Sequence, residues 1–357
     1  MKKIVIACDS YKGCLSSSEV SGAVAEGVSG VYPDCEVVRL AVADGGEGTV
    51  EALVDTLGGH LEWAEVSDPL GRPVRAAYGV AGDLAIIESA AACGLTLLTK
   101  EERNPLIATT KGLGELILAA VDKGCRRFLI GLGGSATNDG GMGMIGVEGF
   151  LEKTRGLQFT VACDVDTPYI GRNGASRVFG PQKGASVQDV EVLEERLRGY
   201  ALKISEDTGI DVSDMPGAGA AGGLGGAFRA YLGAELKRGV DLVLDQIGFD
   251  SVIAGAGLVI TGEGCSDYQT LKGKTAAGVL ERAERLNIPV ALVSGAVRDE
   301  KMLRDRGFRI VEAVTPPAMS LEEAMRPETA KHLVAVATRN ILHQFCIYYR
   351  VLHMRNH

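Results

Sequence analysis

The sequence predicts an α/β fold with two domains, one a Rossmann-like three-layer αβα domain with a parallel sheet and the other an inserted mixed α/β domain. Apolar strand-like segments alternate with helical ones toward both ends of the chain, whereas the middle has short, partly alternating segments separated by Pro and Gly. A chain of 357 residues is also long for a single core. We expect a discontinuous domain of residues 1–62 and 240–357, an inserted domain of residues 63–239, and an active-site cleft between them.

The N-terminal part opens with a βαβα pattern. Residues 3–7 predict a buried strand, and the serines at 16–18 followed by Glu19 predict the start of a helix. Residues 36–42 predict a second strand, which ends in an Asp-Gly-Gly-Glu turn before another helix. Parallel strands place their carboxyl ends at one edge of the sheet, so the residues that follow each strand are the first candidates for a site.

The remaining elements follow in order. Segments at 61–66, 74–78 and 84–88 predict a meander, and a helix around 113–121 leads into an apolar strand at 128–132. A βαβ pattern then returns toward the C-terminus. The later elements are a strand at 157–162, a helix at 187–204, an apolar strand within 258–264, a helix at 276–286, strands at 289–293 and 309–314, and a terminal helix at about 328–343.

The composition is that of an ordinary globular protein and favours a small substrate. The formal charge of −9 argues against a nucleic-acid or anionic-membrane surface, and no apolar run approaches the length of a membrane span. The eight cysteines are scattered without Cys-x-x-Cys pairs or histidines at metal-ligand spacing, which gives zinc and redox motifs no support. Reduced thiols in apolar segments favour a cytoplasmic location. A homo-oligomer is left open.

A glycine-rich loop after the strand at 128–132 is the first candidate for a phosphate site. Its glycines permit a close backbone approach, and its hydroxyl and amide side chains can start a helix whose N–H groups face an anion. A carboxylate in the same loop suits a phosphate carried with Mg²⁺. The alternative is a tight strand-to-helix turn without a ligand. The loop residues are Gly133, Gly134, Ser135, Thr137, Asn138, Asp139, Gly140 and Gly141.

Acids, lysines and glycines also follow other predicted strands. A lysine after a strand can reach a phosphate, and carboxylates two residues apart in an extended segment point the same way. Each cluster has an alternative reading as an exposed turn or as an acid that complements a helix N-terminus. Their recurrence predicts a shared ligand cleft. The residues are Ser10 and Lys12; Asp44, Gly45, Gly46 and Glu47; Asp164 and Asp166; Lys183; and Glu263 and Asp267.

Two glycine runs match a dinucleotide-binding pattern, so an NAD-dependent dehydrogenase is a rival hypothesis. The match at 131–136 follows a predicted strand, whereas the match at 217–222 does not. Against the rival, the first loop continues through Asn138 and Asp139 instead of entering a helix, and a pyrophosphate would be repelled by Asp139 without a metal. A P-loop is absent, because Gly184 directly follows Lys183.

Seven motifs in chain order carry a family resemblance. They are Asp-Ser-Tyr-Lys-Gly at 9–13, Ala-Asp-Gly-Gly-Glu-Gly-Thr at 43–49, Gly-Gly-Ser-Ala-Thr-Asn-Asp-Gly-Gly at 133–141, Ala-Cys-Asp-Val-Asp at 162–166, Phe-Gly-Pro-Gln-Lys-Gly at 179–184, Gly-Ala-Gly-Ala-Ala-Gly-Gly at 217–223 and Thr-Gly-Glu-Gly at 261–264. Together they resemble the bacterial glycerate kinase family of the type that makes 2-phosphoglycerate. The resemblance implies a non-P-loop kinase that transfers the γ-phosphoryl group of ATP to an alcohol of D-glycerate with Mg²⁺.

Phosphoryl transfer requires lysines and metal-holding acids, which gives each motif a hypothetical role. We assign Lys12 and Lys183 to phosphate or the glycerate carboxylate, the loop at 133–141 to phosphate, Asp164, Asp166 and Glu263 to Mg²⁺, and Asp44 or Asp139 to the hydroxyl proton. The remaining substrate or nucleotide contacts are Ser10, Gly45, Gly46, Glu47 and Asp267.

Three departures from the family support a second hypothesis, a nucleotide or hydroxy-acid binding sensor without turnover. The junction at 149–158 is shorter than in relatives, Cys265 stands where arginine is usual, and the tail at 345–357 has no counterpart. If that arginine steadies an anion, its loss weakens substrate binding.

Overall fold

The computed structural model describes residues 1–46, 48–271 and 273–355. It divides into two compact units: a terminal unit of Met1–Asp44 with Val243–His357, and an inserted unit of Gly45–Leu242. The first boundary lies earlier than the expected 62/63, because helix α2 (Thr49–Leu57) packs on strands of the inserted unit. The predicted fold class is confirmed, since one sheet is entirely parallel and the other mixed.

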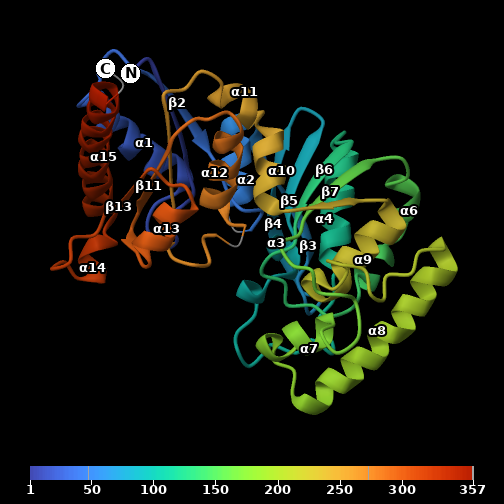
Figure 1. The fold of residues 1–357 in the computed structure, drawn as a ribbon. Helices are drawn as coiled ribbons and strands as arrows, with labels where there is room; N and C mark the ends of the chain where they lie inside the picture. The colour runs from blue at the N-terminus through green and yellow to red at the C-terminus, as the bar shows by residue number, and fades with distance from the viewer. Residues whose placement is uncertain (47, 272, 356–357) are drawn as a thin grey trace. The chain divides into compact units, whose positions relative to one another are not determined.

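The terminal unit is built on a five-stranded parallel sheet with strand order β13-β11-β9-β1-β2. The chain runs from β1 to β2 on one side and from β9 through β11 to β13 on the other, so the direction of winding changes between β1 and β9. Such a switch point opens a crevice at the strands' carboxyl ends. Figure 1 labels β2, β11 and β13 of this sheet. The strands are β1 (Lys3–Cys8), β2 (Glu36–Ala41), β9 (Leu258–Gly262), β11 (Val290–Ser294) and β13 (Ile310–Ala313), with a small pair β10 (Cys265–Ser266) and β12 (Ala296–Val297).

Helices cover both faces of this sheet. Helix α1 packs along α15 and contacts β1 and β2, whereas α12 contacts β9, β1 and β11. The N-terminus of α1 lies at the predicted helix start and has a capping box, because Ser16 Oγ accepts from the Glu19 N–H and Glu19 Oε2 accepts from the Ser16 N–H. The helices are α1 (Ser17–Ser29), α10 (Gly239–Gln246, across the boundary), α11 (Phe249–Ile253), α12 (Thr275–Arg285), α13 (Glu300–Arg306), α14 (Leu321–Ala324) and α15 (Pro327–Arg355), the last longer than predicted.

The inserted unit is built on a six-stranded sheet with strand order β3-β4-β5-β6-β7-β8. The pairs β3–β4 and β4–β5 are antiparallel, as the meander pattern predicted, and the later pairs are parallel. Phe128 and Phe159 stack at 4.7 Å between ring centroids in its core. The strands are β3 (His60–Ser67), β4 (Pro73–Ala81), β5 (Leu84–Glu88), β6 (Arg127–Gly131), β7 (Gln158–Ala162) and β8 (Glu235–Lys237).

One helix of the inserted unit differs from the sequence-based prediction. The helix expected directly after the glycine loop is only the four-residue α5, because the loop itself runs to Gly141. The helices are α2, α3 (Ala90–Cys93), η1 (Leu95–Leu97), α4 (Lys111–Asp122), α5 (Met142–Ile145), α6 (Phe150–Lys153), α7 (Ala175–Phe179), η2 (Pro181–Lys183), α8 (Val187–Thr208) and α9 (Ala220–Leu232).

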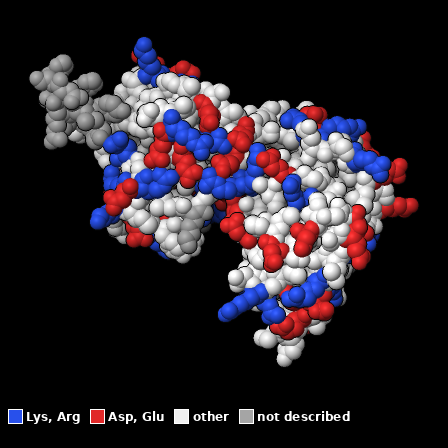
Figure 2. Space-filling view, turned by 45° about the vertical axis from the view of Figure 1, so that its right-hand side comes forward, with Lys and Arg blue, Asp and Glu red and all other residues white. Residues whose placement is uncertain are grey.

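Charged side chains of both signs are interspersed on the face shown in Figure 2. Ion pairs join charged side chains of the protein, such as Arg282 with Asp245 at 2.5 Å and with Asp250 at 3.1 Å. Mixed charges of this kind solvate a surface without creating a strong field of one sign. No helix in the described ranges is long and apolar enough to cross a membrane.

Candidate active site

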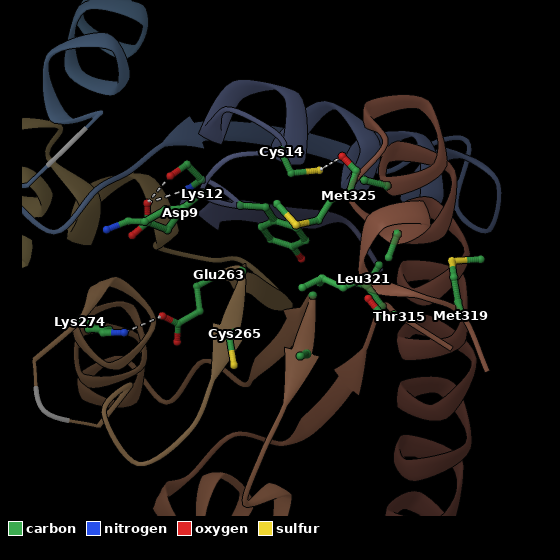
Figure 3. Close-up of a pocket in the computed structure, with 18 of the residues that line it drawn as sticks. Asp9, Lys12, Cys14, Glu263, Cys265, Lys274, Thr315, Met319, Leu321 and Met325 are labelled. Atoms are coloured by element: carbon green, nitrogen blue, oxygen red, sulfur yellow. Dashed lines mark hydrogen bonds and ion pairs between the residues drawn. The ribbon is translucent and has the colours of Figure 1, made fainter. Parts of the chain in front are cut away.

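A cavity of about 490 Å³ lies at the carboxyl ends of β1, β9, β11 and β13 in the terminal unit (Figure 3). Its position is the switch point of the parallel sheet, where β1 leads into Asp9 and β9 into Glu263. The Asp9 N–H donates to the Gly262 carbonyl at 2.8 Å, which holds the two strand ends together. The polar residues that line this terminal-unit cavity include Asp9, Ser10, Lys12, Asp44, Glu263 and Lys274.

Asp9 is a buried carboxylate that hydroxyl and amide donors hold in place. Its Oδ2 accepts from Thr275 Oγ1 at 2.6 Å, and its Oδ1 accepts from the Ser10 N–H at 2.7 Å. Burial raises the pKa of Asp9 to about 6, against the Thr275 hydrogen bond that lowers it. The negative charge of Asp44 raises the pKa of Asp9 further, so these two carboxylates of the terminal-unit cavity interact electrostatically.

Glu263 is held in the same manner on the other strand end. Its Oε1 accepts from Thr270 Oγ1 at 2.5 Å and from Ser266 Oγ at 3.0 Å. Burial raises the pKa of Glu263, while Thr270 and the nearby ammonium of Lys274 lower it. Both carboxylates are therefore fixed in position, as a pre-organised site requires.

Two lysines reach the terminal-unit cavity from different elements. Lys12 is exposed on the loop after β1, and Lys274 Nζ lies 3.8 Å from Glu263 Oε2 at the start of α12. Lys12 was among the residues predicted from the sequence, whereas Asp9 and Lys274 were not. The sequence pattern that could have predicted Lys274 is Gly273-Lys274-Thr275 just before a helix with apolar periodicity. A lysine at that position lies beside the free N–H groups at the start of the helix.

The residues assigned to Mg²⁺ do not form a ready-made cluster. In the parts of the chain that are described, no three His, Cys, Asp or Glu side chains are grouped to hold a metal ion. Asp164 and Asp166 are exposed in the inserted unit, and Asp164 Oδ1 accepts from the Gly239 N–H at 2.9 Å. Mg²⁺ usually takes only one or two protein carboxylates plus substrate phosphates, so the absence of such a cluster among the described residues does not conflict with a magnesium site.

The glycine loop in the inserted unit is mostly buried. Only Gly133 and Gly134 are exposed, whereas residues 135–141 are covered. Lys183 lies beneath the loop, where its Nζ donates to the Thr137 carbonyl at 2.6 Å and to Ser135 Oγ at 3.2 Å. Burial lowers the pKa of Lys183 to about 7, although Asp139 nearby raises it. The geometry thus supports Lys183 as a residue that shapes the loop.

Asp139 organises the same loop from within. Its Oδ2 accepts from the Thr110 N–H at 2.8 Å, from Thr110 Oγ1 at 2.9 Å and from the Gly143 N–H at 3.1 Å. Its Oδ1 accepts from the Gly141 N–H at 3.1 Å. Asp139 thus supplies acceptors for backbone N–H groups of the loop and of Thr110, which explains why an acid sits in a glycine loop.

The glycine run at 217–223 packs against the glycine loop at 133–141. A side chain at Gly222 would collide with the Thr137 carbonyl oxygen, and one at Gly223 would lie 2.7 Å from Gly140 Cα. Both glycines have positive φ inside α9. The dinucleotide pattern at 217–222 is therefore a packing motif. The pattern at 131–136 also lacks its helix, since α5 begins only at Met142.

The other predicted residues have varied surroundings. Ser10 lines the terminal-unit cavity, whereas Asp267 does not and instead accepts from the Gln269 N–H at 2.8 Å within a turn. Gly45 belongs to the inserted unit, where a side chain would lie 2.6 Å from Ala162 Cβ. Gly46 follows it, and Glu47 lies outside the described residues.

Glu88 is a carboxylate that the sequence analysis did not select. It ends β5, and its Oε1 accepts from the Val50 N–H at 3.2 Å in the first turn of α2, which Gly48 does not cap with a side chain. Burial raises the pKa of Glu88 to about 6, while the Val50 bond lowers it. An acid at a strand's carboxyl end was the same signal that selected Glu263.

Glu88→Gln is expected to change how stability depends on pH. Because the folded protein binds the proton more tightly than the unfolded chain, Glu88 stabilises the fold below its ordinary pKa of 4.5 and this contribution is lost as the pH rises through about 6. The free energy of unfolding of the wild type relative to the variant should rise by about 2 kcal/mol between pH 7 and pH 4. Urea unfolding at several pH values measures it, and a difference that stays constant with pH would contradict the assignment.

The comparisons with known proteins agree with the motifs. The model of the glycerate kinase family matches residues 4–151 and 145–346. The chain belongs to the glycerate kinase family. Glycerate kinase of Bacillus subtilis (strain 168) is 44% identical over 353 residues, which cover 90% of this chain and 92% of that protein. Glycerate 2-kinase of Escherichia coli (strain K12) is 42% identical over 370 residues, which cover 95% and 97%.

A solved structure extends this likeness to the fold. The crystal structure of a protein assigned as glycerate kinase 2 from Salmonella typhimurium LT2 matches with a TM-score of 0.87 and 41% identity, covering 98% of this chain and 99% of that one. The glycerate kinase family thus accounts for the predicted motifs and for the architecture. A kinase of this family uses a nucleotide and a small-molecule substrate.

Two of the expected departures from the glycerate kinase family can be located in the structure. The two segments of the family match overlap at residues 145–151, which includes the start of the junction at 149–158 that we expected to be short. There α6 buries Phe150 in the core, and β7 begins soon afterwards at Gln158. Cys265, where the family resemblance led us to expect arginine, lines the terminal-unit cavity together with Glu263.

Proposed function

We propose that the protein transfers the γ-phosphoryl group of ATP to D-glycerate, giving 2-phosphoglycerate, with Mg²⁺ as the cofactor. Membership of the glycerate kinase family over nearly the whole chain carries this proposal. The chemistry of the terminal-unit cavity supports it, because carboxylates and lysines meet there at the carboxyl ends of parallel strands. That combination suits an anion that arrives with a divalent cation.

Each residue of the terminal-unit cavity has a role in this proposal. Lys12 and Lys274 neutralise phosphate oxygens, and Asp9 and Glu263 hold Mg²⁺. When bound, Mg²⁺ supplies positive charge that offsets the charge of the transferred group. Asp44 accepts the proton of the attacking hydroxyl. In the inserted unit, the exposed Gly133 and Gly134 bind phosphate through their backbone N–H groups, and Asp164 and Asp166 are further ligands of Mg²⁺.

Phosphorus NMR of the products formed from ATP and D-glycerate tests the proposed function. We expect ADP and 2-phosphoglycerate to appear together and in equal amounts, and no product without Mg²⁺. Calorimetry with Mg-ATP and glycerate in parallel separates the alternatives. Binding of both ligands without product would support the sensor hypothesis, and binding of NAD without phosphoryl product would support the dehydrogenase.

Lys12→Ala and Asp164→Ala test the assigned roles one unit at a time. Removing one charge-assisted contact to a phosphate or metal should lower kcat/KM by about 10- to 100-fold for each variant. Lys123→Ala is the matched control, because Lys123 only forms an exposed pair with Glu62. Steady-state kinetics of the three variants decides the matter, and wild-type turnover in both test variants would overturn the assignments.

The cysteines bear on the cellular location that we propose. All eight lie in the described part of the chain and are free thiols. Free thiols in apolar surroundings persist in a reducing compartment. This supports a cytoplasmic location.

A further inference from the structure

The terminal-unit cavity has two chemically different ends. Asp9, Lys12, Glu263 and Lys274 gather at one end, and sulfur and aliphatic side chains gather at the other (Figure 3). The polar end accounts for phosphate and Mg²⁺ in the proposed function. The apolar end has no role in that chemistry, because neither glycerate nor a phosphate chain carries a group that would fill it.

The apolar end is a defined surface with a buried floor and an exposed rim. Val314 and Ala330 form part of the floor and are less than one tenth exposed, at 7% and 3%. Leu321 and Met325 line the same cavity but are 71% and 37% exposed. Large apolar side chains that line a cavity and are left in water mark a ligand surface more often than scattered ones do. We call Cys14, Met319, Leu321 and Met325 the apolar rim.

The apolar rim is held in position by its own hydrogen bonds. Cys14 Sγ donates to the Met325 carbonyl at 3.2 Å, which ties the loop after β1 to the segment after α14. Ser320 caps α14 by accepting from the Glu323 N–H at 3.2 Å, which stabilises the short helix on which Leu321 is the first residue. The rim is thus attached to the same loop that carries Lys12 and Asp9.

We propose that the apolar rim receives the base of the nucleotide, so that the terminal unit is the nucleotide-binding unit of this kinase. The inference rests on the proposed function, because it assigns the nucleotide rather than glycerate to this cavity. A nucleotide has a flat, weakly polar base at one end and a charged phosphate chain at the other, which matches the two ends. The cavity volume of about 490 Å³ falls in the range of about 300–1,000 Å³ that small-molecule sites occupy.

Cysteine alkylation in the native protein tests the location directly. Cys14 and Cys265 line the terminal-unit cavity, whereas Cys35 is similarly half-buried and does not line it. At a MgADP concentration about tenfold above Kd, the free fraction falls about tenfold, and the alkylation rates of Cys14 and Cys265 should fall with it. Mass spectrometry of iodoacetamide-treated peptides measures the rates, and Cys35 should react at an unchanged rate.

The outcomes separate this inference from the proposed function. If calorimetry shows that MgADP binds but all three cysteines react as before, the location is wrong and nucleotide use stands. Protection by D-glycerate instead of MgADP would make the cavity the acceptor site and overturn the inference. Absence of both nucleotide binding and turnover would overturn the proposed function together with it.

Leu321→Asp provides an independent test. Because Leu321 is exposed, the substitution should fold normally, yet it places a carboxylate against the base. We expect the Kd for MgADP and the KM for ATP to rise about tenfold or more, while the KM for glycerate and the affinity for magnesium tripolyphosphate stay unchanged. Leu286→Asp is the matched control, since Leu286 is 45% exposed in the terminal unit away from the cavity. An unchanged KM for ATP in Leu321→Asp would contradict the inference.

Discussion

Replacing Asp44 by asparagine is expected to lower kcat by about 10²- to 10⁴-fold, the contribution of a well-placed general base. Asp44 follows β2 and lines the terminal-unit cavity together with Asp9 and Lys12. Its charge raises the pKa of Asp9, so it lies close enough to act on the same ligand. An asparagine keeps the shape of the side chain but cannot accept the hydroxyl proton. Steady-state assays at saturating ATP, glycerate and Mg²⁺ measure the effect.

Two further measurements decide between roles for Asp44. Asp34→Asn removes a carboxylate of the same kind from an exposed position outside the cavity and should leave kcat unchanged. If higher Mg²⁺ restores the activity of Asp44→Asn, the residue holds the metal and does not accept the proton. A kcat within a few-fold of the wild type would remove Asp44 from the mechanism.

Much of the fold could be predicted because local and tertiary preferences agree. The capping box at Ser16 and Glu19 is a local hydrogen-bond pattern, and the structure forms it. The apolar stretch at 258–262 is buried on both sides, which only a covered parallel strand explains. The acid after β9, Glu263, was selected from the sequence, whereas Asp9 after β1 was not, although adjacent parallel strands bring their carboxyl ends together.

The glycine loop shows where the sequence could not decide. Glycine is required where a ligand approaches the backbone closely, and it is also required where another segment of the protein approaches the backbone closely. At Gly140 and Gly222 the approaching group is protein, since the Gly140 N–H donates to the Gly222 carbonyl at 3.0 Å. Lys183 presented the same ambiguity, because its position under the loop depends on segments far apart in the chain. That residues of both units serve one reaction stays a prediction.

Asp139→Asn is expected to destabilise the protein by about 2–4 kcal/mol, because an amide cannot accept from all the donors that surround the carboxylate. Whichever way the asparagine is turned, its NH₂ group faces either the Thr110 and Gly143 N–H groups or the Gly141 N–H. At least one buried donor then loses its acceptor. Urea unfolding at pH 7 measures the change in the free energy of unfolding.

The Asp139→Asn variant also distinguishes a role in shaping the glycine loop from the predicted role of Asp139 as the proton acceptor. Asp122→Asn is the control, because Asp122 is 62% exposed in an ion pair with Lys153, and such pairs contribute little to stability. A residue that shapes the loop should lose stability and activity together, with activity partly recovered under conditions that stabilise the fold. A variant as stable as the wild type with lost kcat would instead make Asp139 the proton acceptor. The hydrogen bonds of its carboxylate favour the first outcome, since Thr110 and Gly143 hold Oδ2 within the loop instead of leaving it directed at a ligand.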